Sequence, residues 1–381
     1  MKVAFNYRYY TTPDHFETVA LNFDTYASKK VAYTLNDIGA VVRFAQDEQS
    51  NGRYVALYLT YEAAKFFNQE MATHELDNNQ VIALAYSFNP NMAKHLSNNL
   101  SQSYIPKHKF RFLESDAEMQ DKIKQVQDAI TDGETYQVNY TTRLVSDIHY
   151  PISDLYYYLT QTNNGGYTAL LDVEEIKVAS ISPELFFQKG AFNNQENVVV
   201  SKPMKGTMPR SINKDEDLIN YDILKNSLKD RAENVMIVDL LRNDISRISK
   251  PGTIHVNKPF FIESYKTVYQ MTSMVSGRLE DETSLTDILK ALFPCGSITG
   301  APKLNTMSYI KALEPNPRNI YCGTIGLLSP DDKMIFNIPI RTLEYRNEKV
   351  HYGVGAGITI DSIPEKEVQE FRDKTKILEM L

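Results

Sequence analysis

The 381-residue chain has an ordinary globular composition, with 42% hydrophobic and 23% charged residues. Its 41 lysines and arginines against 48 aspartates and glutamates leave a net charge of −7, which disfavours binding to nucleic acid or to a membrane surface. No run of about 18 apolar residues could span a bilayer, and the first residues lack the apolar core of a signal peptide. Two cysteines in so long a chain indicate a reducing compartment, so we expect a cytoplasmic protein.

In chain order, the sequence predicts a short N-terminal part and a larger C-terminal part. The stretch 89–109, rich in Asn, Ser and Lys, predicts the connection, and we expect a part at 1–105 that packs on a core domain at 110–381. The N-terminal part contains an apolar run at 54–61 that indicates a strand buried on both faces. The larger part opens with a capping box at 115–118 that predicts the start of a helix.

The C-terminal part mixes strand-like runs with long helical patterns. Strands are predicted at 136–144, 177–181, 185–188, 198–201, 324–328, 334–343 and 350–354. A long helix is predicted over about 215–243, and a last helix opens with Ser362 to Glu365. The apolar face of the long helix holds Ile219, Leu224, Leu228, Ala232, Val235 and Met236. This mixture indicates a layered α+β or α/β fold.

Two pairs of acidic residues have the spacing of helix neighbours. Asp230 and Glu233 lie three positions apart in the long predicted helix, and Glu367 and Glu370 repeat this spacing in the last one. Four carboxylates that converge from two helices suit a hard cation such as Mg²⁺, which prefers oxygen ligands. A solvated charged face has the same spacing, and spacing alone favours that alternative.

A glutamate and a lysine are predicted to meet at one end of a hairpin. Glu184 ends one predicted strand region, Lys205 follows the next, and Asn193 and Asn194 supply the turn between the strands. Such a pair can act as acid and nucleophile if burial raises the pKa of the glutamate and lowers that of the lysine. A simple cross-strand salt bridge is the alternative, and spacing alone favours it.

Two glycine-containing segments and one arginine are candidates for binding anions. The loop at 293–303 leads into a helix, whose first amides favour negative charge. The segment 353–357 is not followed by a helix, which excludes a dinucleotide fingerprint but permits an anion-binding turn. Arg341 shares the polar face of the predicted strand 334–343 with Asn337, where an inward arginine could hold a carboxylate. An exposed outer face is the alternative for this strand.

Several long segments, in the same order along the chain, resemble the chorismate-utilising enzymes from about residue 115 to the end. They are GETYQVNYTTR at 133–143, SPELF at 182–186, KPMKGTMPR at 202–210, KDRAENVMIVDLLRNDISR at 229–247, GSITGAPK at 296–303, IYCGTIG at 320–326, GVGAGITIDS at 353–362 and EVQEFRDK at 367–374. The resemblance implies an α+β fold of two stacked antiparallel β-sheets flanked by helices, with the site between them. It also implies Mg²⁺, held by Glu233 and Glu370 with the support of Asp230 and Glu367.

The resemblance also assigns roles to single positions. Lys205 stands where relatives that aminate chorismate at carbon 4 have lysine and where anthranilate-forming relatives have alanine. Gln137 stands where relatives that add water carry an activating lysine. The implied catalytic residues are Glu184, as the acid, and Lys205, as the nucleophile. The implied substrate-binding residues are Arg341, Tyr321, Thr299, Lys303, Gly355, Ala356, Gly357, Lys374 and Gln137.

The implied reaction converts chorismate and ammonia to 4-amino-4-deoxychorismate through a lysine adduct, on the route to 4-aminobenzoate and folate. No G-x-C-x-G glutaminase segment occurs, so we expect the ammonia to come from a separate glutamine amidotransferase subunit. Formation of anthranilate is the alternative reaction. Two positions depart from the family pattern: Gln270 replaces a histidine found in many relatives, and Cys295 replaces a glycine. We therefore assign no proton transfer to position 270.

Overall fold

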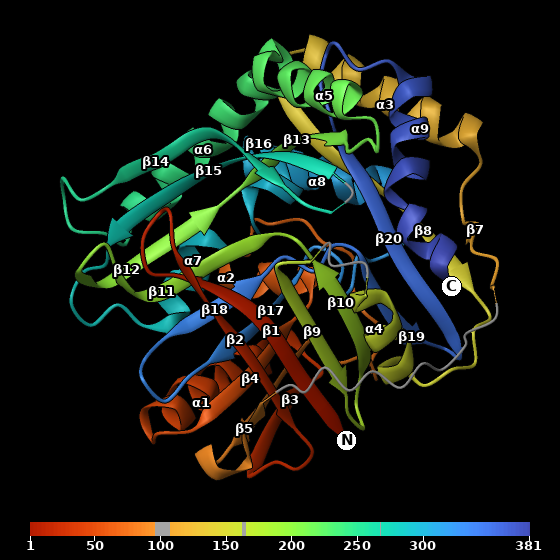
Figure 1. The fold of residues 1–381 in the computed structure, drawn as a ribbon. Coiled ribbons are helices and arrows are strands. Elements are labelled where there is room, and N and C mark those ends of the chain that lie inside the picture. Colours follow the sequence, from red (N-terminus) through yellow and green to blue (C-terminus); the bar gives the residue numbers. More distant parts are fainter. Residues whose placement is uncertain (96–106, 162–164, 267) are drawn as a thin grey trace.

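Two antiparallel sheets, each of ten strands, form the fold in the computed structural model, which describes residues 1–95, 107–161, 165–266 and 268–381 (Figure 1). The predicted α+β architecture of two stacked sheets with flanking helices is confirmed. Residues 96–106 of the predicted connection lie outside the described residues. The division into parts at 1–105 and 110–381 stays a prediction.

The first sheet has the strand order β16-β8-β20-β19-β10-β9-β1-β2-β6, and β7 also pairs with β8. Its strands are β16 (Gly300–Ala301), β8 (Gln137–Ser146), β20 (Lys349–Ile358), β19 (Thr342–Arg346), β10 (Lys177–Ser182), β9 (Tyr167–Asp172), β1 (Lys2–Tyr10), β2 (Phe16–Phe23), β6 (Lys94–His95) and β7 (Arg111–Phe112). The strands β1, β2 and β6, near the N-terminus, therefore continue a sheet whose other strands come from residues 111–358.

The second sheet has the strand order β13-β15-β12-β11-β18-β17-β4-β5-β3, and β14 also pairs with β15. Its strands are β13 (Met204–Pro209), β15 (Val268–Arg278), β12 (Gln195–Lys202), β11 (Leu185–Phe192), β18 (Met334–Asn337), β17 (Thr324–Leu328), β4 (Tyr54–Leu59), β5 (Ala83–Phe88), β3 (Ser28–Ala32) and β14 (His255–Ser264). The apolar run at 54–61 contains β4, which is buried apart from its first residue, as predicted.

Helices cover the outer surfaces of the sheets (Figure 1). They are α1 (Ile38–Ser50), α2 (Ala64–Phe67), α3 (Asp116–Thr131), α4 (Ile152–Thr160), α5 (Lys214–Asn226), α6 (Leu228–Ser246), α7 (Leu285–Leu292), α8 (Lys303–Leu313) and α9 (Pro364–Lys374). The predicted capping box at the start of α3 is confirmed, because Ser115 and Glu118 cap each other's backbone amides. Within the described ranges, we find no helix both long and apolar enough to cross a membrane.

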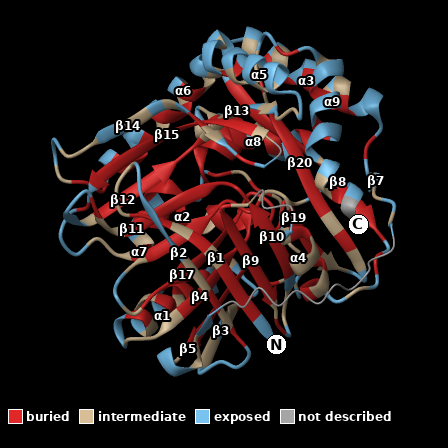
Figure 2. Cartoon of the chain, viewed as in Figure 1, coloured by how far each residue is buried: buried red, intermediate tan, exposed pale blue. Residues whose placement is uncertain are grey.

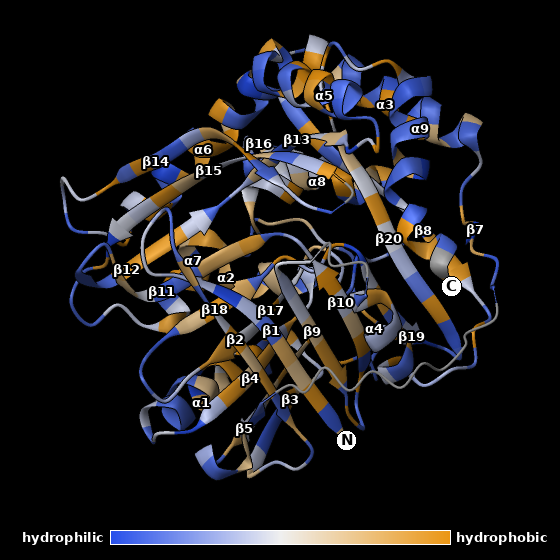
Figure 3. Cartoon of the chain, viewed as in Figure 1, coloured by the Kyte–Doolittle hydropathy of each residue, from blue (hydrophilic) through white to orange (hydrophobic). Residues whose placement is uncertain are grey.

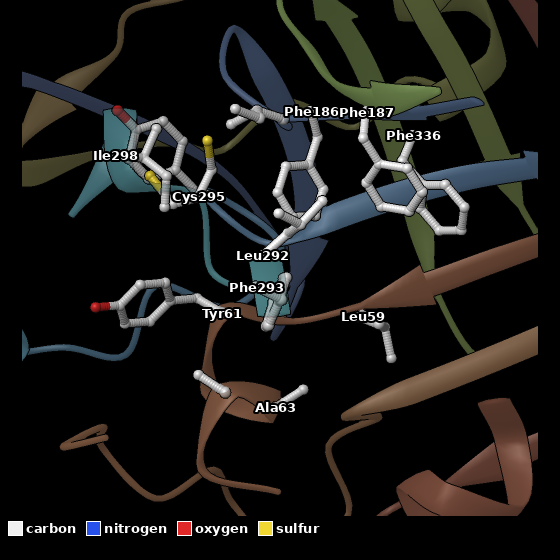
Figure 4. Packing of buried hydrophobic residues seen from close by; sticks show 14 of the residues in the cluster. Leu59, Tyr61, Ala63, Phe186, Phe187, Leu292, Phe293, Cys295, Ile298 and Phe336 are labelled. Carbon is white, nitrogen blue, oxygen red and sulfur yellow. The ribbon is translucent and has the colours of Figure 1, made fainter. Parts of the chain in front are cut away.

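The strands carry most of the buried and apolar residues, whereas the helices α3 and α9 expose polar surfaces (Figures 2 and 3). Helix α5 also exposes the apolar residues Leu218, Ile219 and Ile223. Figure 4 shows one part of the core, where β11 meets β18 and the chain after α7. Phe187 stacks on Phe336 at 4.5 Å between ring centres, and Phe186 meets Phe293 edge-on at 6.1 Å. Burial of each such ring contributes roughly 1.5–3 kcal/mol. The core therefore anchors the residues that immediately precede the loop at 295–299.

The predicted helix over 215–243 is in fact two helices. Ser227 has an extended backbone, ends α5 and caps α6 by accepting a hydrogen bond from the Asp230 amide at 3.2 Å. Because the helix restarts there, the apolar face expected from one continuous helix does not form. Ile219 and Leu228 are exposed, Leu228 to 82%, and only Leu224 of α5 is buried.

The predicted strand 334–343 is also wrong as a single element. β18 ends at Asn337 in the second sheet, and β19 begins at Thr342 in the first sheet. The chain crosses between the sheets at 338–341, where Arg341 has a positive φ of 52°. Asn337 is fully buried and binds the backbones of Tyr167 and Ile325, so it shares no strand face with Arg341.

Candidate active site

The predicted acid and nucleophile lie together and share one neighbour. Glu184 immediately precedes β11, and Lys205 lies on β13 at the edge of the second sheet. The expected hairpin of β11 and β12 is confirmed, with Leu185 opposite Lys202. The Ser297 hydroxyl donates to Glu184 Oε1 at 2.8 Å, and Lys205 Nζ donates to the Ser297 carbonyl at 3.5 Å. Sequence reasoning gave Ser297 no role, although it lies within a segment that carried the resemblance.

Burial prepares Glu184 to hold a proton near neutral pH. Its side chain is 4% exposed, and desolvation raises its pKa to about 7 against the opposing effects of the Ser297 hydroxyl and the Lys205 charge. A carboxyl group with this pKa carries its proton in a substantial fraction of molecules at neutral pH. It can therefore donate a proton to a departing hydroxyl group.

The first sheet supplies the wall opposite Lys205. A Cβ added at Gly357 would lie 1.9 Å from Gln137 Nε2 and 3.1 Å from Lys205 Nζ, so the three residues meet at one point. Gln137 is 1% exposed, and among the described residues neither polar atom of its side chain has a hydrogen-bond partner. A buried polar group left unpaired costs roughly 1–3 kcal/mol. This amide is thus available to a polar ligand.

The segment 353–357, predicted as an anion-binding turn, is instead the interior of strand β20. Gly355, Ala356 and Gly357 pair with β8, opposite Thr141 to Asn139. Its pairing with β19 ends at Tyr352, so beyond that point no described strand pairs with the second edge of β20. The glycines serve close approach rather than turning, as the contact of Gly357 with Gln137 shows.

Arg341 lies in the segment that crosses between the sheets, and Tyr321 packs against β20 at Gly353. The Ile338 amide donates to the Glu184 carbonyl at 3.2 Å, which fixes the crossing segment that carries Arg341 beside the predicted acid. Arg341 is partly buried, and desolvation lowers the pKa of its guanidinium. A Cβ at Gly353 would lie 2.3 Å from the ring of buried Tyr321. The strand prediction that first singled out Arg341 is wrong, but its crossing segment is tied to Glu184 through Ile338 and to β10 through the Arg341 carbonyl, which accepts the Ile181 amide at 3.0 Å.

The remaining predicted binding residues have internal partners. The Thr299 hydroxyl donates to the Cys295 carbonyl at 3.1 Å. Lys303 forms a buried ion pair with Asp244 at 2.9 Å, which neutralises the positive charge expected there. Lys374 donates at 2.7 Å to the carbonyl of Gly355 and therefore reaches the glycine strand.

The four predicted metal ligands lie on α6 and α9, which approach each other around a lysine. Lys229 Nζ is 3.9 Å from an oxygen of Glu233 and 3.9 Å from an oxygen of Glu367. Burial raises the pKa of both glutamates, and the negative charges of Asp230 and Glu370 raise that of Glu233 further. The charge of Lys374, in contrast, lowers the pKa of Glu370. Across the described ranges, no three acidic, His or Cys side chains are close enough to form a metal cluster.

The chemistry of these donors, rather than their present spacing, suits a hard divalent cation. The donors are carboxylate oxygens, they repel one another, and a lysine ammonium lies between two of them as a partial substitute for a cation. The cluster also borders the nucleophile, because a Cβ at Gly206 would lie 2.9 Å from Asp230. Gln270 lies on β15 opposite Thr207 of β13, and its buried Oε1 is without a hydrogen-bond partner in the described ranges.

Comparison with known proteins agrees with this geometry. The family of chorismate binding enzymes matches residues 4–379, and the chain belongs to this family. Aminodeoxychorismate synthase component 1 of Escherichia coli K12 is 40% identical over 262 residues, which cover 68% of this chain and 57% of that protein. Anthranilate synthase component 1 1 of Haloarcula marismortui is 34% identical over 347 residues, covering 88% of this chain and 67% of that protein.

The corresponding Salmonella typhimurium component 1 is 39% identical over 254 residues, which cover 67% of this chain and 55% of that protein. The chain thus matches little more than half the length of these aminodeoxychorismate synthase relatives. The crystal structure of anthranilate synthase component I from Streptococcus pneumoniae superposes with a TM-score of 0.76 and 21% identity, covering 99% of this chain and 92% of that chain. At this identity, the superposition establishes the fold alone.

Proposed function

We propose that this chain is the chorismate-aminating component of an aminodeoxychorismate synthase, a transferase acting in cytoplasmic 4-aminobenzoate and folate biosynthesis. The observation that carries the proposal is the position of Lys205, whose ammonium lies beside Gly357 and shares Ser297 with the buried Glu184. A nucleophile and a protonated acid at one point are what a two-step displacement of a hydroxyl group requires.

Chorismate is a dianion, and the site offers it positive and hydrogen-bonding groups. Arg341 and Tyr321 hold the enolpyruvyl carboxylate together with the backbone of Gly355 to Gly357. The unpaired amide of Gln137 faces the same space as Lys205 and binds a polar group of the ring. Lys374 supports the glycine strand through the Gly355 carbonyl. We assign Thr299 and Lys303 a role in shaping the loop rather than in direct binding.

The reaction then follows from the two catalytic side chains. Glu184 gives its proton to the 4-hydroxyl, which leaves as water while Lys205, in its neutral amine form, bonds to carbon 2 and both ring double bonds shift. Ammonia next bonds to carbon 4, both double bonds shift back, and the bond between carbon 2 and Lys205 breaks to release the neutral lysine amine. Two displacements return the amine to the carbon that lost the hydroxyl, and the covalent adduct divides one difficult step into two easier ones.

Glu233 and Glu370 would hold a magnesium ion through their carboxylates, with Asp230 and Glu367 in support. When bound, it supplies positive charge against the ring carboxylate of the substrate. Before the ion binds, the ammonium of Lys229 balances part of the negative charge of Glu233 and Glu367.

The ammonia comes from a separate glutamine amidotransferase subunit. Glutamine hydrolysis by such subunits needs a reactive cysteine, and both cysteines here are buried. Desolvation raises the pKa of Cys295 to about 11 and that of Cys322 to about 12, which makes both poor nucleophiles. The relatives named component 1 are consistent with a second component.

Anthranilate synthesis is the second candidate, and the Haloarcula relative favours it by matching the largest share of the chain among the three relatives described above. Lys205 argues against it, since the anthranilate-forming pattern has alanine there. Intact mass of the protein after incubation with chorismate and Mg²⁺, without ammonia, tests the distinction. We expect an added mass that Lys205→Ala abolishes and that Lys290→Ala, an exposed control on α7, retains. An adduct that survives Lys205→Ala would contradict the covalent role.

A further inference from the structure

We propose that Arg318 is a positioning residue of the active site, which holds the loop carrying Ser297 against strand β8. This inference rests on the proposed function, because it concerns how the acid and the nucleophile of that reaction are kept in place. Arg318 lies outside the catalytic contacts and follows α8 by five residues.

The side chain of Arg318 is 2% exposed and uses its guanidinium to join three elements. Nη1 donates to the Ile298 carbonyl at 2.7 Å, and Nη2 donates to the Asn139 carbonyl of β8 at 2.7 Å. Nε and Nη2 also bind both oxygens of Glu314, at 2.9 and 2.6 Å. Such a fork fixes orientation as well as distance, because each donor points in a set direction.

The same network continues on both sides of the guanidinium. Glu314 accepts a hydrogen bond from the Thr141 amide at 2.9 Å, so the Arg318–Glu314 ion pair also contacts β8 at a second residue. The guanidinium carbon of Arg318 lies over the aromatic ring of Tyr61, 4.7 Å from the ring centre. Figure 4 shows Tyr61 in the same part of the core as Cys295 and Ile298. Glu62, next to Tyr61, accepts the Arg318 amide at 2.7 Å.

The loop held in this way determines the catalytic geometry. Ile298 is the neighbour of Ser297, which contacts Glu184 through its hydroxyl and Lys205 through its carbonyl. Asn139 lies two positions after Gln137 on β8, on the wall opposite Lys205. Arg318 therefore reinforces the direct hydrogen bonds between this loop and β8, in which the Asn139 side chain donates to the Ile298 carbonyl at 3.1 Å and the Asn139 amide donates to the Thr299 carbonyl at 2.8 Å. It does so without touching either catalytic side chain. A displacement of about 1 Å at such a point can cost roughly 100-fold in rate.

Removal of Arg318 alone would leave the Glu314 carboxylate buried without its partner and could prevent folding. The informative variant is the double substitution Arg318→Met with Glu314→Gln, which removes both charges and keeps an acceptor for the Thr141 amide. Arg318→Lys tests whether charge alone suffices, and Arg242→Met, a side chain 53% exposed on α6, is the matched control. The three variants and the wild type are all tested as the full chain.

Hydrogen exchange and steady-state kinetics, together with the Arg318→Lys variant, distinguish an effect on the position of the loop from a general loss of fold stability. Hydrogen exchange by mass spectrometry should be faster in peptides covering 295–299 and 137–141 of the double variant, and unchanged elsewhere. With chorismate, Mg²⁺ and ammonium, kcat should fall roughly 10- to 100-fold while KM for chorismate changes less than threefold. Arg318→Lys should recover less than a tenth of the lost kcat, because a lysine cannot bind both carbonyls.

Two results would overturn the inference. One is a double variant that exchanges faster in the loop yet keeps wild-type kcat, since the loop would then not govern catalysis. The other is unchanged exchange in the loop, since Arg318 would then not hold it. If the wild-type chain forms no product at all, the proposed function fails, whereas the exchange experiment still decides whether Arg318 holds the loop.

Discussion

Replacing Glu184 by glutamine should stabilise the protein at alkaline pH while abolishing its activity. The buried carboxyl has a pKa of about 7, against 4.5 for an ordinary glutamate. Between these values the folded protein binds a proton that the unfolded chain has released, so the free energy of unfolding falls as pH rises through this window. A difference of 2.5 units at 1.36 kcal/mol per unit corresponds to about 3 kcal/mol. Glutamine cannot ionise, so Glu184→Gln removes this loss.

Urea denaturation at pH 5 and at pH 8 measures the effect. The stability of Glu184→Gln relative to the wild type should rise by up to about 3 kcal/mol between the two pH values, because other titrating groups cancel in the comparison. Glu70→Gln, at an exposed position, serves as the control and should show no such change. A pH-independent difference between Glu184→Gln and wild type would refute the idea that Glu184 is held protonated by burial.

Three further predictions concern neighbouring groups. Gly357→Ala should lower kcat/KM for chorismate at least roughly tenfold with the fold retained, because the added Cβ would displace the Gln137 amide. Wild-type kinetics in this variant would contradict the assignment of Gln137 and Gly357 to the substrate site. Glu233→Gln should raise the Mg²⁺ concentration for half-maximal activity by roughly tenfold, and calorimetric titration should show the same loss of affinity. Lys303→Met should destabilise the fold by up to about 3–5 kcal/mol in thermal melts, since it removes the 2.9 Å ion-pair partner of the buried Asp244 and leaves it the more distant Arg247 at 4.0 Å. A large increase in KM without loss of stability would instead restore Lys303 to the binding site.

Local patterns in the sequence predicted the parts of the site that depend on neighbouring strands. Glu184 and Lys205 could be brought together from sequence because the β11–β12 hairpin ends at Leu185 and Lys202, beside both residues, and hairpin pairing is a local property. The capping box at Ser115 is local in the same sense. The stacked sheets and the roles of most binding residues came instead from resemblance to a family.

Contacts between distant segments account for most of the errors. Arg341 was assigned to a strand because apolar alternation continues from 334 to 343, and no local feature marks the crossing between the sheets. The glycines at 353–357 suggested a turn, but they are required because Gln137 and Tyr321 approach β20 closely. Lys303 pairs with Asp244, 59 positions away, which its own loop could not reveal.

The identity of the product tests the central claim most directly. The purified chain would be incubated with chorismate, Mg²⁺ and ammonium, with and without an aminodeoxychorismate lyase, and the products separated by chromatography. We predict 4-aminobenzoate that forms only when the lyase is present and that disappears with Lys205→Ala. Anthranilate formed without the lyase would contradict the account, because Lys205 would then not direct the amine to carbon 4.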